Sequence, residues 1–244
     1  MSSGTFLLIG SSSVLGAAAA RCISQSGHSL ILTYHREFKH HFLTHAFPKA
    51  ELHRLDVRDG QSVASFGSMF AKRECALDGI VYAAGVGLLR PMNLSTSDQT
   101  REVVDVNVNG VLRVLRGCWP SLQRGHSASV VVVSSIMGLV GAPGMSTYGM
   151  AKAALMGLVR CLAIEWAPRG VRINAVAPGI VPSPLVDEMF KHMSSDQVEI
   201  IRQRHPLGFG QAEDVGNAIM FLLSRNARWI TGVTLPVDGG YTAQ

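Results

Sequence analysis

The sequence predicts an α/β fold: a doubly wound, seven-stranded parallel sheet between two layers of helices (α/β/α). Three observations predict it. Seven short, mostly apolar runs of strand length are spread along the 244 residues. Stretches with helical spacing lie between them, and strand–helix alternation implies parallel strands joined by right-handed crossovers. A turn with glycine at both ends, residues 10–16, follows the first run and opens the first helical stretch.

Each strand candidate suits a sheet that is buried on both faces. The seven candidates are residues 6–9, 30–33, 51–55, 79–83, 130–134, 172–175 and 233–237. Helical spacing is clearest over residues 15–26, 97–122 and 147–166. Pro236 cannot donate to a strand ladder, so the last strand is expected at a sheet edge or at a bulge.

One domain, residues 1–244, is expected because neither a repeat nor a linker interrupts the alternation. Residues 182–205 are the exception to it and contain one expected short helix. This segment is predicted to be either a mobile lid over a substrate pocket or an ordinary surface insertion. Leu88, Leu89 and Met92 suggest an apolar pocket beside it.

Composition narrows the function classes. The net charge of +5 favours anionic partners, such as a nucleotide cofactor or an acidic carrier protein. No basic stripe with interleaved aromatics indicates nucleic acid. The four cysteines are far apart, which indicates buried thiols in a reducing compartment. His41 and His45 would share a helix face, but without an acid at matched spacing no metal is expected.

A cytoplasmic protein is expected. The apolar start of the chain lacks the basic region of a signal peptide, and Gly10 with three serines interrupts it. No apolar run is expected to reach the length of a membrane span, so no membrane partner is predicted.

Tyr148 and Lys152 are the clearest chemical signal. Four residues apart on a predicted helix, they share a face, and Ser135 at a strand end can reach them. A neighbouring positive charge lowers the pKa of a phenol from its ordinary value near ~10. The phenol is then a workable acid or base, and Ser135 can hydrogen-bond a carbonyl oxygen. Such residues can reduce a ketone or oxidise an alcohol, although a Tyr-x-x-x-Lys pair alone is also common on solvated helix faces.

The order of motifs strengthens this interpretation. The glycine turn is followed by Asn107, Ser135, Tyr148 with Lys152, and then Pro178-Gly179. With these residues together, the chain resembles the short-chain dehydrogenase/reductase family, and within it the 3-oxoacyl-(acyl-carrier-protein) reductases most. The resemblance covers nearly the whole chain and implies a Rossmann-type fold.

The resemblance implies that the first turn binds the phosphates of a dinucleotide, with free amides of a helix N-terminus. The residues expected to do so are Gly10, Ser12, Ser13, Leu15 and Gly16. Val14 departs from the family's pattern, which has glycine there. Valine crowds the cofactor or forbids a positive φ, so either the turn is adjusted or cofactor binding is weakened. The alternative is a plain strand–helix turn.

NADP(H) is the expected cofactor. After the second strand, Tyr34 takes the position at which NAD-preferring enzymes place an acid, and His35, Arg36 and Lys39 follow. His35 and Arg36 are expected to receive the 2′-phosphate. The alternative is a solvated basic turn.

Three further segments are expected, by resemblance, to border the cofactor after the third, fourth and sixth strands. Their residues are Asp56, Val57, Ala84, Gly85, Pro178, Gly179, Ile180 and Ser183. Asp56 can equally be a cap, and Pro-Gly alone is a strong turn signal. Tyr82 and Ala83 replace two asparagines of the family's pattern, so the hydrogen bonds of those asparagines must be replaced or absent.

The resemblance also implies the roles of the catalytic residues. Tyr148 donates a proton, Ser135 orients the carbonyl oxygen, and Lys152 lowers the phenol pKa and holds the nicotinamide ribose. Asn107 holds a water in the proton relay. The alternative for Asn107 is a polar residue within a helix, although asparagine is a poor helix former. Ser134 is expected to be structural or to line the cofactor site.

The expected reaction is NADPH-dependent hydride transfer to a ketone, with a 3-oxoacyl thioester on acyl carrier protein or coenzyme A as the substrate. A sugar or cyclic ketone is the alternative substrate. A catalytically weak cofactor-binding or scaffold subunit is the alternative of another class. The resemblance implies a homotetramer, or a homodimer, through the long helices after the fourth and fifth strands. Arg124 and Arg169 lie where carrier-protein reductases tend to show basic residues.

Overall fold

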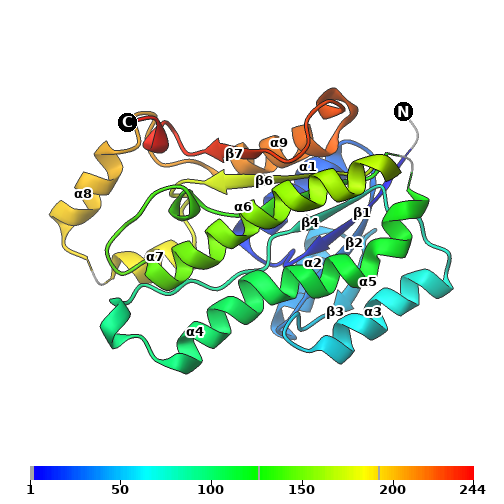
Figure 1. Cartoon of the computed structure of the whole chain (residues 1–244), viewed down its shortest axis with the longest axis horizontal. Coiled ribbons are helices and arrows are strands. Elements are labelled where there is room, and N and C mark those ends of the chain that lie inside the picture. Colours follow the sequence, from blue (N-terminus) through cyan, green and yellow to red (C-terminus); the bar gives the residue numbers. More distant parts are fainter. Residues whose placement is uncertain (1–2, 126, 192) are drawn as a thin grey trace.

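A seven-stranded parallel sheet forms the centre of the molecule (Figure 1). The computed structural model describes residues 3–125, 127–191 and 193–244. The strand order is β3-β2-β1-β4-β5-β6-β7 and every pairing is parallel. The strands are β1 Thr5–Ile9, β2 Ser29–Tyr34, β3 Glu51–Arg54, β4 Gly79–Tyr82, β5 Ser129–Val133, β6 Arg172–Pro178 and β7 Thr234–Val237. The predicted fold class is confirmed, and β7 lies at an edge, as Pro236 required.

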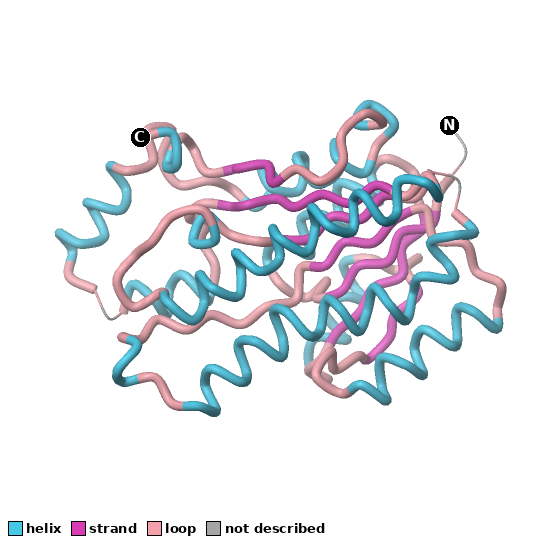
Figure 2. Tube along the Cα trace, viewed as in Figure 1, coloured by secondary structure: helices cyan, strands magenta, loops and turns pink. Residues whose placement is uncertain are grey.

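Helices cover both faces of the sheet (Figure 2). They are α1 Val14–Gln25, α2 Phe38–Ala46, α3 Gly60–Lys72, α4 Ser97–Val104, α5 Gly110–Arg124, α6 Ser146–Trp166, α7 Pro184–Phe190, α8 Ser195–Gln203 and α9 Ala212–Leu223. One apolar core lies under α1, α2 and α9, and the other lies under α3, α5 and α6. Alternate residues of a strand serve the two cores: Leu7 belongs to one and Leu8 to the other.

Small residues bring the helices close together. A Cβ atom on Gly67 of α3 would collide with the backbone of Gly117 of α5, so these two helices touch through their backbones. On the other face, a Cβ atom on Gly216 of α9 would lie 3.1 Å from the Ala18 backbone of α1. This close packing holds both helical layers firmly against the sheet.

Two expected elements differ in the structure. The helix predicted over residues 97–122 is interrupted by a π-helical turn, Asp105–Asn109, in which the Gly110 amide donates to the carbonyl of Asp105, five residues earlier. Residues 182–205 contain two helices, α7 and α8, rather than one. With α4 they extend beyond the carboxyl ends of β6 and β7, at the left of Figure 1.

By length and composition alone, one segment of the described residues, Ser146–Arg169, passes the test for a membrane-crossing helix. The sequence predicted no such run. Its apolar character has a structural cause, because α6 packs against β6 and sends Leu155, Val159 and Ala163 into the core. Core helices commonly pass this test.

Candidate active site

Ser135, Tyr148 and Lys152 meet at the carboxyl end of β5. Ser135 follows β5 and caps a 3₁₀ turn, where its Oγ accepts from the Met137 amide at 3.1 Å. Tyr148 and Lys152 lie in the first two turns of α6, and Lys152 Nζ is 5.6 Å from the centre of the Tyr148 ring. Ser135 also hydrogen-bonds Tyr148. The structure therefore brings together the three residues that the sequence singled out.

Burial sets the protonation of this group. It raises the pKa of Tyr148, and the hydrogen bond from Ser135 offsets this only in part. Burial lowers the pKa of Lys152 to about 8. The sequence predicted that Lys152 would lower the pKa of Tyr148; in this structure burial dominates that pKa and raises it, and Lys152 Nζ donates to the Val133 carbonyl at 3.0 Å. Tyr148 is thus a neutral phenol at pH 7 and a proton donor.

Ser134 is structural. Its Oγ is buried and donates to the Lys152 carbonyl at 2.9 Å, which ties the end of β5 to α6. This bond fixes the helix that carries Tyr148 relative to the strand that carries Ser135. The sequence favoured Ser135 over Ser134 because its spacing from Tyr148 matches the family's pattern, and in the structure it is Ser135 that contacts Tyr148.

Asn107 lies within the π-turn and is fully buried. Its Nδ2 donates to the carbonyls of Val103 and Val86, both at 2.9 Å. Its Oδ1 has no hydrogen-bond partner among the residues that the structure describes. A Cβ atom on Gly85 would lie 2.8 Å from this Oδ1 and 3.5 Å from Lys152 Nζ, so both polar atoms border the same small space. An unpaired buried acceptor beside an ammonium group is suited to hold a water.

The glycine turn is built for close approach. Gly10 has φ +79°, and a Cβ atom there would lie 2.5 Å from the Ala84 nitrogen. Ser13 caps α1 by accepting from the Gly16 amide at 3.0 Å, and a Cβ on Gly16 would collide with the Gly10 carbonyl. The first amides of α1 have no intrahelical acceptors and suit a phosphate. The turn therefore fits a dinucleotide.

Val14 does not have the positive φ that valine would resist. Val14 is the first residue of α1, and the only non-glycine residues with positive φ among those described are Glu74 and Ser127. The turn accommodates valine with an ordinary helical backbone. Of the two expectations for this position, crowding toward the phosphates is the one that still applies.

Replacing Gly10 with alanine tests the close contact of this turn. Gly10→Ala is expected to unfold at a lower temperature than Gly27→Ala, because both glycines have φ +79° but Gly27 has nothing within 4 Å of its Cβ position. Strain alone costs about 1–2 kcal/mol in each variant. The collision with Ala84 adds roughly 1–3 kcal/mol, and each kcal/mol lowers the Tm by about 2–4 °C. Equal Tm values for the two variants would show that the turn can open.

At the end of β2, His35 and Arg36 are exposed. Tyr34 is buried and its ring lies 5.2 Å from that of His40, so it belongs to the core rather than to the surface. Asp56 is held by Arg58, whose Nη2 lies 2.8 Å from Oδ2, and this hydrogen bond lowers the pKa of Asp56 to about 2. The sequence did not anticipate Arg58, which pairs with the Asp56 carboxylate just after β3.

The remaining predicted cofactor residues lie at the carboxyl ends of β3, β4 and β6 or just after them. Val57 and Pro178 are buried, while Ala84, Gly85 and Gly179 are at least partly accessible. Ser183 caps α7, and its Oγ accepts from the Val186 amide at 3.4 Å. Among the described residues, no acceptor for the Ser183 hydroxyl hydrogen is seen.

His205 is a second residue that the sequence missed. It is buried, its Nε2 accepts from the Ile180 amide at 3.2 Å, and its Nδ1 donates to the Ile201 carbonyl at 2.8 Å. It therefore connects α8 to the Pro178–Ile180 turn. Its place directly before Pro206, at the end of the expected lid, was the only signal in the sequence.

The loop after β4 packs between the expected lid and the start of α6. A Cβ atom on Gly87 would lie 2.6 Å from Leu185 of α7, and the Arg90 amide donates to the Gly144 carbonyl at 2.8 Å. Exposed apolar side chains gather along this loop and the lid: Leu89, Met92, Leu94, Leu185 and Ile200. Leu88 is half-buried. The rim of the site is thus apolar.

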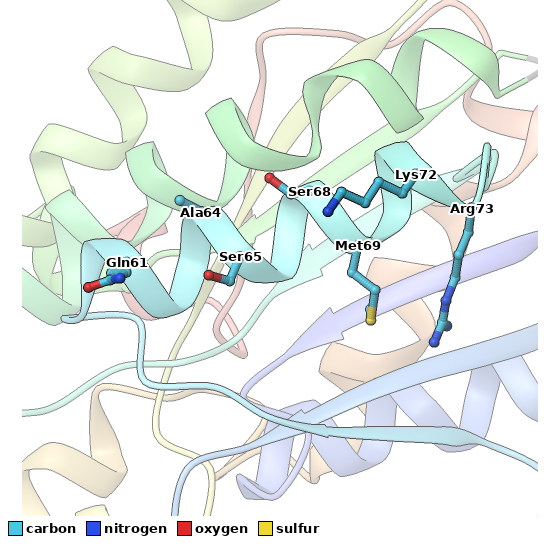
Figure 3. A pocket seen from close by; sticks show the side chains of 7 residues that line it. All are labelled: Gln61, Ala64, Ser65, Ser68, Met69, Lys72 and Arg73. Carbon is cyan, nitrogen blue, oxygen red and sulfur yellow. The ribbon is translucent and has the colours of Figure 1, made fainter.

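Two surface hollows lie outside this cluster. The larger, 620 Å³, follows the side chains of α3 from Gln61 to Arg73 (Figure 3), and none of the predicted site residues lines it. The second, 300 Å³, lies between the 137–146 loop and α6, beside Tyr148 in sequence but without it in the lining. Within the described part of the chain, no group of three or more His, Cys, Asp or Glu side chains is placed to hold a metal ion.

Known proteins resemble the chain over almost its full length. The family model described as Enoyl-(Acyl carrier protein) reductase matches residues 9–242. A 3-oxoacyl-[acyl-carrier-protein] reductase, FabG, of Rickettsia prowazekii (strain Madrid E) is 33% identical over 238 residues, covering 97% of this chain and 95% of that protein. A cis-4-hydroxycyclohexanecarboxylate dehydrogenase of Sinomonas cyclohexanicum is also 33% identical, with 97% and 96% covered.

Solved structures resemble the fold equally well. ElxO with NADP bound superposes with a TM-score of 0.90 at 28% identity, over 100% of both chains. The structure of gox2181 gives a TM-score of 0.93 at 24% identity and covers 100% of this chain and 97% of that one. The second likeness concerns the fold alone.

Proposed function

The chain belongs to the short-chain dehydrogenase/reductase family, has 3-oxoacyl-(acyl-carrier-protein) reductases among its relatives, and is an oxidoreductase that uses a nicotinamide cofactor; on that premise we propose that it is an NADPH-dependent ketone reductase. The observation that carries the proposal is the cluster of Ser135, Tyr148 and Lys152, with the unpaired Asn107 Oδ1 beside the ammonium group. A neutral phenol next to a hydroxyl is the arrangement that protonates a reduced carbonyl oxygen.

NADP(H) fits the residues present. The glycine turn and the first amides of α1 would hold the phosphates, and Lys152 would hold the nicotinamide ribose. His35 and Arg36 are exposed and basic at the end of β2, where a 2′-phosphate would be placed. ElxO, a protein of the same fold, has NADP bound. When bound, the cofactor supplies the hydride.

In the proposed reaction, Ser135 donates a hydrogen bond to the substrate carbonyl oxygen and fixes its position. Tyr148 gives its proton to that oxygen as negative charge develops there. Once the product oxygen is protonated, the single Ser135 hydroxyl hydrogen is released to donate to the phenolate, as it does to the phenol in the free structure. Lys152 and a water held by Asn107 Oδ1 then return a proton to Tyr148.

A 3-oxoacyl thioester is the proposed substrate. The apolar rim formed by Leu89, Met92 and Leu185 suits an acyl chain. Docking of acyl carrier protein to Arg124 and Arg169 is a separate part of the proposal. Arg124 ends α5. Arg169 follows α6 and lies about 30 Å along that helix from Tyr148. The two arginines are therefore not beside the active site of their own chain.

A cyclic alcohol or ketone is the second candidate substrate. It is favoured by one observation: the relative described as cis-4-hydroxycyclohexanecarboxylate dehydrogenase is as similar to this chain as the reductase from Rickettsia. Comparing turnover of acetoacetyl-coenzyme A with that of 4-oxocyclohexanecarboxylate distinguishes the two. A catalytically weak scaffold subunit would turn over neither.

We also propose that residues 1–244 act as one domain, that residues 182–205 form a lid, and that the protein is cytoplasmic. A homotetramer is proposed through α5 and α6, whose exposed Leu112 and Ile164 would be covered by another copy. A mass measurement in solution gives the number of copies.

Calorimetric titration with NADPH and NADH tests the cofactor preference. NADPH is expected to bind at least 10-fold more tightly than NADH, and Arg36→Ala to remove most of that difference by removing a cation at the 2′-phosphate. Arg101→Ala, which removes an exposed arginine of α4, is the control and should preserve the preference. Equal affinities for the two cofactors in the unmodified protein would reject the NADPH preference.

A further inference from the structure

Tyr82 is buried at the end of β4 and its hydroxyl donates to the Val106 carbonyl at 2.8 Å. It stands at the position where the family's pattern has an asparagine. Burial raises its pKa, so it remains a donor throughout the usable pH range. The acceptor is the residue directly before Asn107. The Tyr82 side chain of β4 therefore holds the backbone of the segment that carries Asn107.

We propose that Tyr82 is a positioning residue for the proton relay: its bond to Val106 holds the π-turn Asp105–Asn109 in place and so aims Asn107 Oδ1 at the space beside Lys152. The inference rests on the proposed reductase function. It assigns to Tyr82 the task that the missing asparagine leaves open.

The π-turn is the element that this bond supports. Its hydrogen bonds reach one residue further than those of an α-helix, as the Gly110 amide bond to Asp105 shows. Such turns are rare and less favourable than a regular helix, and they persist where the surroundings hold them. The Tyr82 hydroxyl is a hydrogen-bond donor from outside the helix to Val106, within this turn.

Gly110 makes room for the hydroxyl. A Cβ atom at this position would collide with Tyr82 Oη and would lie 3.0 Å from Val57 Cγ2. Glycine in a helix is costly relative to alanine, so its presence here needs a reason. The tyrosine and the glycine are thus a matched pair in which the larger side chain fills the space left by the smaller.

The hydrogen bond from Tyr82 to Val106 links the two segments that border the proton relay. Tyr82 lies three residues before Gly85, and Val106 lies one residue before Asn107. A Cβ atom on Gly85 would touch both Asn107 Oδ1 and Lys152 Nζ. Asn107 Nδ2 closes the arrangement by donating to Val86, the residue after Gly85. Loss of the Tyr82 bond would let the π-turn move relative to the loop that borders the relay.

Tyr82→Phe in the full chain is the test. It is expected to lower kcat by roughly 10- to 100-fold, because small displacements of a catalytic group have effects of this order. The KM for NADPH should change less than 2-fold, and the pH profile of kcat should shift because proton return to Tyr148 is slowed. Gly110→Ala should lower kcat in the same way, and adding Tyr82→Phe to it should restore stability by removing the colliding hydroxyl.

Ser129→Ala is the matched control. It removes another fully buried hydroxyl-to-carbonyl bond, from β5 to Leu222 at 3.0 Å, on the side of the sheet away from the π-turn. It should lower the Tm without changing kcat or its pH profile. If Tyr82→Phe behaves in the same way, Tyr82 is merely structural and the inference is overturned.

A measurement that does not depend on turnover tests the role of Tyr82 separately from the proposed function. The side-chain amide resonances of Asn107, assigned by NMR with an Asn107→Asp variant, should shift in Tyr82→Phe and stay unchanged in Ser129→Ala. Unchanged resonances in both variants would overturn the inference. If the shift occurs but the unmodified protein reduces no ketone, the positioning holds and the proposed function fails.

Discussion

Replacing Tyr148 with phenylalanine is expected to lower kcat by roughly 10³-fold, about 4 kcal/mol of transition-state stabilisation. The phenol is the group that Ser135 contacts in the cluster, and burial raises its pKa and so keeps it protonated at neutral pH. The aromatic ring stays, so the fold and the affinity for NADPH should be preserved. Initial rates with a ketone, calorimetric titration with NADPH and the Tm measure the three quantities separately.

Tyr34→Phe is the control for this substitution. Tyr34 is a tyrosine buried at the end of β2, and its ring packs against His40 without a role in the proton transfer. Its loss of a hydroxyl should leave kcat within about 2-fold of the original value. Turnover that survives Tyr148→Phe unchanged would remove Tyr148 from the reaction and would favour the scaffold alternative.

The second large effect concerns Lys152 and pH. Burial lowers its pKa to about 8 in the free protein, so the ammonium group is present below that pH and is lost as the pH rises through it. Because kcat/KM for NADPH reports groups of the free enzyme, it should fall about tenfold for each pH unit above 8. Lys152→Met should lower kcat/KM by roughly 10²–10³-fold at pH 7 and remove this dependence.

Lys152→Arg separates charge from shape. Arginine stays protonated throughout the range, so its kcat/KM should be lower than that of the unmodified protein but independent of pH between about 7 and 9. A fall above pH 8 that persists in Lys152→Arg would have to come from another group, and the assignment to Lys152 would be wrong.

The sheet could be predicted because its strands are continuous apolar runs. Residues 6–9, for example, are apolar on both faces, and a strand buried between two helical layers needs no polar face. Asp105–Asn109 could not be predicted, because nothing in the sequence distinguishes a π-turn from the helices that it joins. The two helices of residues 182–205 were under-predicted because they are only seven and nine residues long.

At the site, residue types and order identified Ser135, Tyr148 and Lys152, but not their electrostatics. The sequence argument considered the charge of Lys152 and omitted burial, which dominates the pKa of both residues. Contacts between distant segments were also invisible: the loss of an asparagine at position 82 was evident, whereas the bond from Tyr82 to Val106 joins residues that are 24 positions apart. His205 was missed for the same reason, because its partner Ile180 lies 25 positions earlier in the chain.

The most direct test of the account follows NADPH and acetoacetyl-coenzyme A in one reaction with the purified protein. We expect NADPH to be consumed, one 3-hydroxybutyryl thioester to form for each NADPH, and both changes to be abolished by Tyr148→Phe. NADPH that binds but is not consumed, with this thioester and with 4-oxocyclohexanecarboxylate alike, would contradict the assignment as a ketone reductase.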